Sequence, residues 1–215
     1  SCSTPNAYIF YALDDLPATP STPYGGPFNT GGAEVIRAIA TKLGYLQSAV
    51  AYYLPSVVVH SSVEMTNMNG RYILADDFTS SASIGTADNP FKGFIDGNYN
   101  AFTLTGHALI GVAEDAEIKN IVVSSVTYSG SGNVGAIINT AKGTTKLYNS
   151  GVQDGSVSGG TNTGGLVGLI ESGSSVRVVN CYNYADVSGS DYAAGIVGKN
   201  EGTVSSDGTV GNVRR

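Results

Sequence analysis

Short apolar runs bounded by glycine recur through the second half of the chain. The run "GLVG" at residues 165–168 reappears as "GNVG" at 132–135, as "GIVG" at 195–198 and, more weakly, as "ALIG" at 108–111. The closing glycines are 24, 33 and 30 residues apart: Gly111, Gly135, Gly168 and Gly198. Spacings of about 20 to 50 residues are typical of solenoid proteins, so the pattern predicts stacked repeats.

A second element follows each glycine run and ends in asparagine. The segments "AEIKNIVV", "TKLYNSGV" and "VRVVNCYNY" place Asn120, Asn149 and Asn180 at separations of 29 and 31 residues. No helical pattern lies between the strands, which argues against a βαβ sheet. If each repeat is one coil of a parallel β-helix, equivalent asparagines stack about 4.8 Å apart and form a hydrogen-bonded ladder. Glycine then occupies sharp turns or close backbone approaches.

We therefore predict an all-β fold, with a right-handed parallel β-helix over residues 68–215. Residues 1–67 have a different pattern, because several prolines stand in polar surroundings and indicate an extended arm. Between residues 33 and 54 the apolar positions recur at helical spacing: Val35, Ile36, Ile39, Leu43, Leu46, Val50 and Tyr53. Asn29 or Thr30 can cap this α-helix and Pro55 ends it. We expect the helix to cover the exposed end of the β-helix core.

Three stretches resemble the GLUG-type repeats of large bacterial surface and secreted proteins: "GLVG", "NCYNYADVSG" and "PFKGFIDGNYNAFTL". The resemblance covers about residues 68–205. It implies a β-helical coil and says little about activity, since such repeats are known mainly as passive parts of adhesins, autotransporter-like proteases and other surface polypeptides. An extracellular or cell-surface location follows from the same resemblance.

Composition narrows the range of partners. The net charge is −6, and Lys and Arg are scattered apart from the pair at 214–215, so no basic stripe favours nucleic acid. No run approaches the roughly 20 apolar residues of a membrane span, which predicts no membrane insertion. Cys2 and Cys181 could form one disulfide in an oxidising compartment. Lipoprotein processing requires cysteine at the first mature position, whereas here the cysteine is the second residue.

Candidate chemistry is sparse. The stretch "GSGNVG" at 130–135 matches a dinucleotide fingerprint, but its second half recurs as a repeat motif. Six acidic residues on predicted turns could serve a glycosidase or a calcium-dependent lyase: Asp76, Asp77, Asp88, Asp96, Glu114 and Asp115. His60 and His107 have no zinc-ligand spacing. We therefore assign no catalytic residue, cofactor or metal.

The tyrosines are the remaining candidates for an interaction surface. Tyr182, Tyr184 and Tyr192 are concentrated in one repeat and could project outward. Exposed tyrosine suits protein interfaces and stacking against sugars, whereas buried tyrosine would belong to the core. Both interpretations stay open at this point.

The sequence thus favours a non-catalytic extracellular bacterial module. It would act in adhesion, or build a filament or matrix through stacking of solenoid ends, because only a short segment follows Gly198 and no helix caps it. Its partners would be further copies or other surface proteins. The alternative is a carbohydrate-binding or polysaccharide-degrading β-helix, and a third interpretation is a passive spacer within a larger surface protein.

Overall fold

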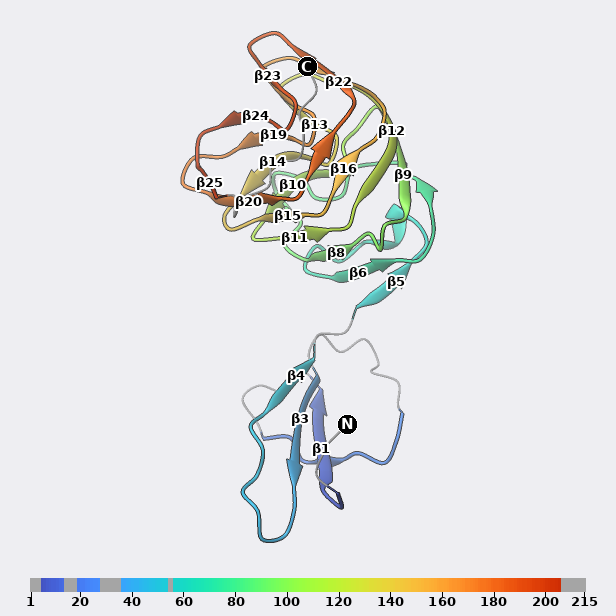
Figure 1. Ribbon diagram of the computed structural model, residues 1–215, viewed down its shortest axis with the longest axis vertical. Helices are drawn as coiled ribbons and strands as arrows, with labels where there is room; N and C mark the ends of the chain where they lie inside the picture. Colours follow the sequence, from blue (N-terminus) through green and yellow to red (C-terminus); the bar gives the residue numbers. More distant parts are fainter. Residues whose placement is uncertain (1–4, 14–18, 28–35, 54–55, 206–215) are drawn as a thin grey trace. The chain divides into compact units, whose positions relative to one another are not determined.

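The chain divides into two compact units, residues 1–56 (unit 1) and residues 57–215 (unit 2). The computed structural model describes residues 5–13, 19–27, 36–53 and 56–205 (Figure 1). The division falls after Ser56 rather than after residue 67, because the strand that follows pairs with unit 2.

Unit 1 is a four-stranded antiparallel sheet in the order β2-β1-β3-β4. Its strands are β1 (Tyr8–Leu13), β2 (Thr22–Pro23), β3 (Ile36–Thr41) and β4 (Ala51–Tyr53). The prediction of a capping α-helix is therefore wrong for residues 36–53. The proposed cap residues Asn29 and Thr30 lie outside the described residues.

The helix prediction failed because a short apolar run fits a helical and a strand period equally well. In β3 the residues alternate, with Arg37 and Ile39 buried and their neighbours half-exposed. Pairing with β1, which sequence spacing does not reveal, selects the strand. Leu43 and Leu46, which lie on the apolar stripe of the predicted helix, are 99% and 97% exposed.

The described residues of unit 2, 57–205, form four sheets in which every strand pair is parallel. One seven-stranded sheet has the order β25 (Thr203–Ser205), β20 (Ser175–Val179), β15 (Lys146–Tyr148), β11 (Glu117–Lys119), β8 (Phe94–Asp96), β6 (Arg71–Leu74) and β5 (Val57–Val59). A four-stranded sheet has the order β10 (Ile110–Glu114), β14 (Ile138–Lys142), β19 (Val167–Ile170) and β24 (Val197–Asn200).

The other two sheets complete the unit. A second seven-stranded sheet contains β7 (Phe78–Thr79), β9 (Ala101–Thr105), β12 (Val122–Ser129), β16 (Gly151–Val152), β17 (Gly155–Gly159), β21 (Tyr182–Asn183) and β22 (Asp186–Gly189). A three-stranded sheet has the order β13 (Asn133–Gly135), β18 (Asn162–Gly164) and β23 (Tyr192–Ala194). Within the described residues the only helical segment is the 3-10 turn η1 (Ser62–Glu64).

From β10 onward the chain visits the four sheets in a fixed cyclic order and returns to the first after 28 to 30 residues. Equivalent residues of successive repeats therefore stack. Ile95, Ile118 and Leu147 form one such column, and all three are fully buried. Burying each of these side chains stabilises the fold by about 1.5–3 kcal/mol. This arrangement is compatible with a parallel β-helix.

The strand register corrects one repeat assignment. Ile138 pairs with Val167, and Val167 pairs with Val197, so residue 139 lies opposite Gly168 and Gly198. Gly111 belongs to the same column, since Ile110 pairs with Ile138. Gly135 does not belong to it, because it pairs with Gly164 in another sheet. The column is thus Gly111, Asn139, Gly168 and Gly198.

The glycines of this column are required by close approach rather than by a turn. A Cβ added to Gly168 would lie 2.6 Å from the nitrogen of Val134 and 2.7 Å from the carbonyl oxygen of Asn139. Neither Gly168 nor Gly198 has a positive φ. The backbones of the three-stranded and four-stranded sheets touch here, and only glycine leaves room for that contact.

Candidate interaction surface at the asparagine ladder

The three repeat asparagines form a continuous side-chain ladder at one corner of unit 2. Asn180 Nδ2 donates to Asn149 Oδ1 over 2.9 Å, and Asn149 Nδ2 donates to Asn120 Oδ1 over 3.3 Å. Each asparagine has a positive φ, of 55° at Asn120, 46° at Asn149 and 53° at Asn180. Asparagine tolerates this left-handed conformation better than most residues. The residue type thus serves the backbone turn and the ladder together.

Asp96 continues the ladder from one register position earlier, since it pairs with Lys119 rather than Asn120, and the sequence analysis missed it. Asn120 Nδ2 donates to Asp96 Oδ1 over 2.8 Å, and Lys119 Nζ lies 3.2 Å from Asp96 Oδ2. Burial is the largest single effect and raises the pKa of Asp96, but hydrogen bonds from Asn120, Asn98 and Lys119 together outweigh it, so the pKa is lowered. A fixed negative charge therefore ends the ladder. The available signal was the spacing of 24 residues between Asp96 and Asn120.

A second asparagine pair lies between the strands of the three-stranded sheet. Asn162 Nδ2 donates to Asn133 Oδ1 over 2.6 Å, and Asn133 Nδ2 donates to Thr140 Oγ1 over 3.0 Å. Their separation of 29 residues equals that between Asn120 and Asn149, so the sequence did contain the signal. Asn162 is buried, and this pair therefore holds the sheet together rather than facing a ligand.

Two tyrosines follow Asn180, the last asparagine of the ladder, along the chain. The rings of Tyr182 and Tyr184 are 5.2 Å apart between centroids, and Tyr184 is 55% exposed. Tyr182 pairs with Gly151, over which its ring lies, because a Cβ on Gly151 would come within 2.5 Å of the ring. The intervening Asn183 points inward and is buried. Both rings therefore belong to one outward surface.

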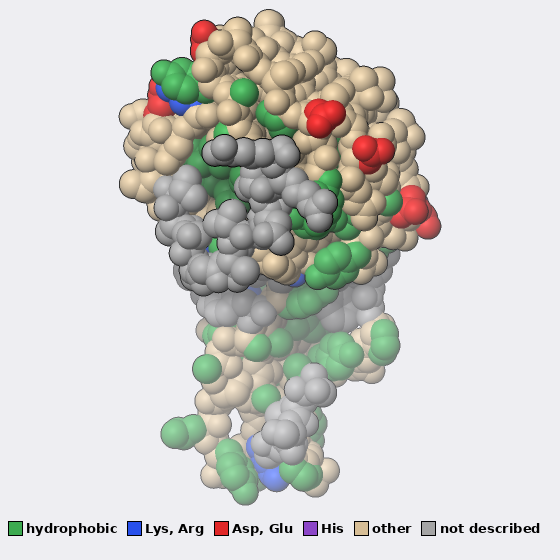
Figure 2. Space-filling view, turned by 45° about the horizontal axis from the view of Figure 1, so that its top comes forward, with side chains coloured by type: hydrophobic (Ala, Val, Ile, Leu, Met, Phe, Trp, Pro, Cys, Tyr) green, Lys and Arg blue, Asp and Glu red, His purple; other side chains and the backbone are tan. Residues whose placement is uncertain are grey.

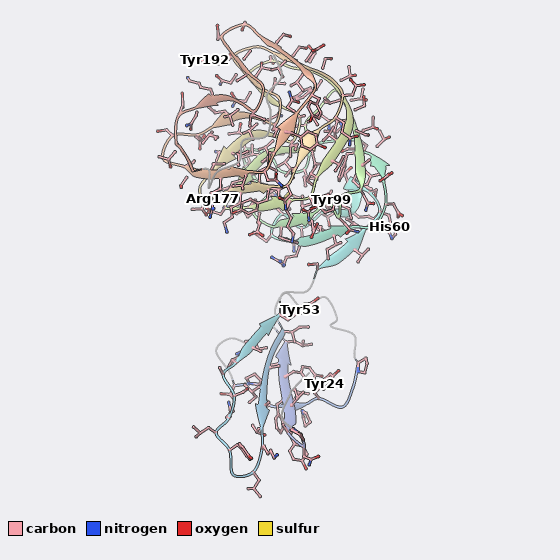
Figure 3. The ribbon with its side chains drawn as sticks, in the orientation of Figure 1. Tyr24, Tyr53, His60, Tyr99, Arg177 and Tyr192 are labelled. Atoms are coloured by element: carbon pink, nitrogen blue, oxygen red, sulfur yellow. The ribbon has the colours of Figure 1, made fainter. Side chains whose placement is uncertain are left out.

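Tyr192 does not join this pair. It lies on β23 in the three-stranded sheet, is 49% exposed and has Lys199 Nζ 4.9 Å from its ring centroid. Tyr99, Arg177 and Tyr192 lie at separate places on the surface of unit 2 (Figure 3). The structure thus brings two of the three predicted interaction tyrosines together.

Charged side chains of both signs lie on the outer face of the seven-stranded sheet that contains β5. Lys146 Nζ lies 3.5 Å from Glu117 Oε2 in the next strand, and Arg71 Cζ lies 4.1 Å from the ring centroid of Phe94. Arg177 Cζ lies 5.9 Å from the ring of Tyr148, which precedes Asn149. Basic side chains outnumber acidic ones on this face, which carries Arg71, Lys119, Lys146 and Arg177 against Asp96 and Glu117.

Five of the six predicted acidic candidates, all except Asp88, have local structural partners. Asp77 accepts a hydrogen bond of 2.6 Å from the amide of Ala101, and Glu114 pairs with Lys92 at 3.1 Å. The Asp115 carboxylate accepts from the amide and hydroxyl of Thr144, which lowers its pKa.

Asp76 pairs with His60, and the hydrogen bond between them raises the pKa of His60. His107 contacts the carbonyl oxygens of Ala108 and Ser80. Among the described residues, no group of three or more His, Cys, Asp or Glu side chains could hold a metal ion.

Two further sequence candidates have structural roles. Residues 130–135 lead into β13 and then β14 with no intervening helix, so the glycine-rich stretch lacks the helix N-terminus that holds a pyrophosphate. Cys181 is buried and its thiol lies 3.3 Å from the carbonyl oxygen of Val179. Burial is the main cause that raises the pKa of this thiol to about 11. Cys2 lies outside the described residues.

No family model, curated protein or solved structure matches this chain. In the part of the chain that the structure describes, no helix has the length and apolar character needed to cross a membrane. The ladder corner is a column of three amides, of which Asn149 and Asn180 are exposed and Asn120 is half-buried, and it ends at the carboxylate of Asp96. The rings of Tyr182 and Tyr184 follow Asn180 along the chain. Such a surface can hydrogen-bond and stack.

Proposed function

We propose that this chain is a non-catalytic extracellular bacterial surface module, built as a right-handed parallel β-helix of GLUG-like repeats. It acts in adhesion or as a subunit of a filament or matrix that grows by stacking of solenoid ends. A stack of hydrogen-bonded repeats with an asparagine ladder along one corner suits a rigid scaffold.

The observation that supports self-assembly is the order of one sheet. The seven-stranded sheet is parallel throughout, with β5 at one edge and β25 at the other. Among the described strands, each of these two pairs on one side only. A second copy whose β5 lay beside β25 would continue the sheet with the same polarity. Such a head-to-tail contact does not close on itself and generates a filament.

Negative-stain electron microscopy across a concentration series tests this proposal. We expect filaments at high concentration, and we expect Val58→Lys to abolish them, because Val58 lies on β5 and is 57% exposed. The matched control is Ser156→Lys, which adds the same charge to an exposed position of β17, away from both edges. Dispersed particles at every concentration would contradict assembly and leave adhesion as the function.

The pairing of Tyr182 with Tyr184 favours carbohydrate binding as a second candidate. Sugars stack on exposed aromatic rings and hydrogen-bond to planar amides, and both groups lie at the ladder corner. A glycan array probed with the whole chain tests this candidate. Tyr184→Ala should abolish the signal, whereas Tyr192→Ala, on another sheet, should keep it. Equal signals from both variants would remove the ladder corner from consideration.

A further inference from the structure

An ordered turn joins β3 to β4 in unit 1. Gly44 has a φ of +81°, and the amide of Tyr45 donates to the carbonyl oxygen of Lys42 over 3.1 Å, which together describe a type II turn. Below the turn, the amide of Ser48 donates to the carbonyl oxygen of Ala40, and Ser48 Oγ accepts from the amide of Ala40. Within unit 1, the connection extends beyond the ends of its strands (Figure 1).

The tip of this turn is apolar and almost wholly exposed. Leu43 is 99% exposed, Leu46 is 97% exposed and Tyr45 between them is 67% exposed. Tyr8, which pairs with Thr41 at the same end of the sheet, is 72% exposed. Hydrophobic side chains gather around a basic one at this end of unit 1 (Figure 2). Single exposed leucines are common, but two on one ordered turn beside two tyrosines form an apolar patch of the kind that marks an interaction site.

The charge of the patch indicates which partner. Lys42 Nζ lies 5.0 Å from the ring centroid of Tyr45, so a cation stands directly beside the apolar tip. The continuous segment 36–53, which carries the turn, contains Arg37 and Lys42 and no Asp or Glu. This basic character is local to the turn segment, since unit 1 also contains Asp14, Asp15 and Glu34 and the chain as a whole carries a net charge of −6. The complementary partner is therefore apolar and anionic together.

We propose that the tip formed by residues 42–46 inserts into an anionic lipid surface. Leu43 and Leu46 enter the region between headgroups and acyl chains, Tyr45 and Tyr8 lie at the headgroup level, and Lys42 contacts lipid phosphate. A convex tip suits a bilayer, which needs no preformed groove to receive it. The contact requires no spanning segment, and it departs from the sequence-based expectation of no membrane insertion, which considered only segments long enough to cross.

Vesicle flotation with the full chain tests the proposal. The probes are vesicles of phosphatidylcholine alone and of phosphatidylcholine mixed with phosphatidylglycerol. We expect binding to the mixed vesicles, a loss of about 100-fold in partitioning for the double variant Leu43→Ser/Leu46→Ser, and a loss of about fivefold for Lys42→Gln. The control Val63→Ser/Tyr99→Ser removes two exposed apolar side chains of unit 2 and should bind as the wild type does.

Leu43, Leu46, Val63 and Tyr99 are exposed and Lys42 is half-exposed. We therefore expect unchanged circular dichroism melts, which exclude unfolding as the cause of a loss of binding. Absence of binding to the mixed vesicles, or equal binding by the double leucine variant, would overturn the proposal. Equal binding to neutral vesicles would overturn the anionic assignment. Self-association that the double leucine variant abolishes, without vesicle binding, would assign the tip to a second copy of the chain and would also overturn it.

Discussion

Asn180 donates a hydrogen bond of 2.9 Å from its side-chain amide to Oδ1 of Asn149, which occupies the equivalent position one repeat earlier. The bond joins two residues 31 positions apart in sequence, and each of them holds a left-handed backbone conformation. Asparagine therefore has two roles here: it adopts the left-handed backbone conformation of the corner, and its side chain links successive repeats.

Replacement of the central ladder residue should separate these two roles. Asn149→Ala loses both ladder hydrogen bonds and replaces asparagine by a residue that tolerates left-handed backbone less well, so we expect a loss of about 2 kcal/mol in the free energy of unfolding. Asn149→Gly removes the same bonds without the backbone penalty and should cost about 1 kcal/mol. Urea denaturation of both variants measures the difference. A glycine variant as stable as the wild type would mean that the ladder contributes no net stability.

The core assignment is tested by a pair of leucines with opposite exposure. Leu166 is fully buried, whereas Leu46 is 97% exposed. We expect Leu166→Ala to lower the free energy of unfolding by about 2–5 kcal/mol, since the substitution leaves a cavity in a stacked core. Leu46→Ala should change it by less than about 0.5 kcal/mol. An unchanged melting temperature for Leu166→Ala would contradict the parallel stacking of the repeats.

Gly168 should tolerate no side chain. Gly168→Ala places a Cβ 2.6 Å from the nitrogen of Val134. The clash can be removed only if the three-stranded and four-stranded sheets move apart. We expect a loss of about 1–3 kcal/mol or more in the free energy of unfolding, measured by thermal melts. Gly25→Ala is the matched control, because no atom lies within 4 Å of the Cβ that it adds. Equal melting temperatures for the two variants would show that the sheets are not in direct contact at Gly168.

We expect the pKa of His60 to lie above the ordinary value for histidine. Its hydrogen bond and ion pair with Asp76 raise the pKa of His60 above 6.5, and Glu64 adds to this effect. Because the folded-state pKa is raised, the stabilising contribution is complete below about pH 6.5 and is lost as the pH rises through the folded-state pKa. An NMR titration of the wild type and of Asp76→Asn measures the shift. If Asp76→Asn leaves the His60 pKa unchanged, Asp76 is not the cause.

The spacing of residues along the chain was enough to predict the asparagine ladder, but it was not enough to predict which residues pair between strands. The Asn spacing indicated a ladder because identical side chains in stacked repeats must meet if the repeats have similar length. The glycine spacing misled, since "GNVG" at 132–135 looks like "GLVG" at 165–168 although Gly135 pairs with Gly164. Asn139 occupies the true equivalent position, where its Oδ1 accepts from the amide of Gly135 over 3.1 Å. Similarity between short sequence motifs does not show which glycine contacts which backbone segment.

By itself the sequence determined the all-β character of the repeat region, the repeat length near 30 residues and the three asparagines of the ladder, because these depend on spacing along one chain. The tertiary structure alone decided the rest. The segment 36–53 became two strands and an exposed turn because β1 supplied hydrogen-bond partners that helical periodicity does not reveal. Tyr182 and Tyr184 lie on one surface and Tyr192 lies on another, because the chain enters a different sheet between Tyr184 and Tyr192. Pairing between segments distant in sequence selects among local conformations of similar energy, and no local pattern contains that choice.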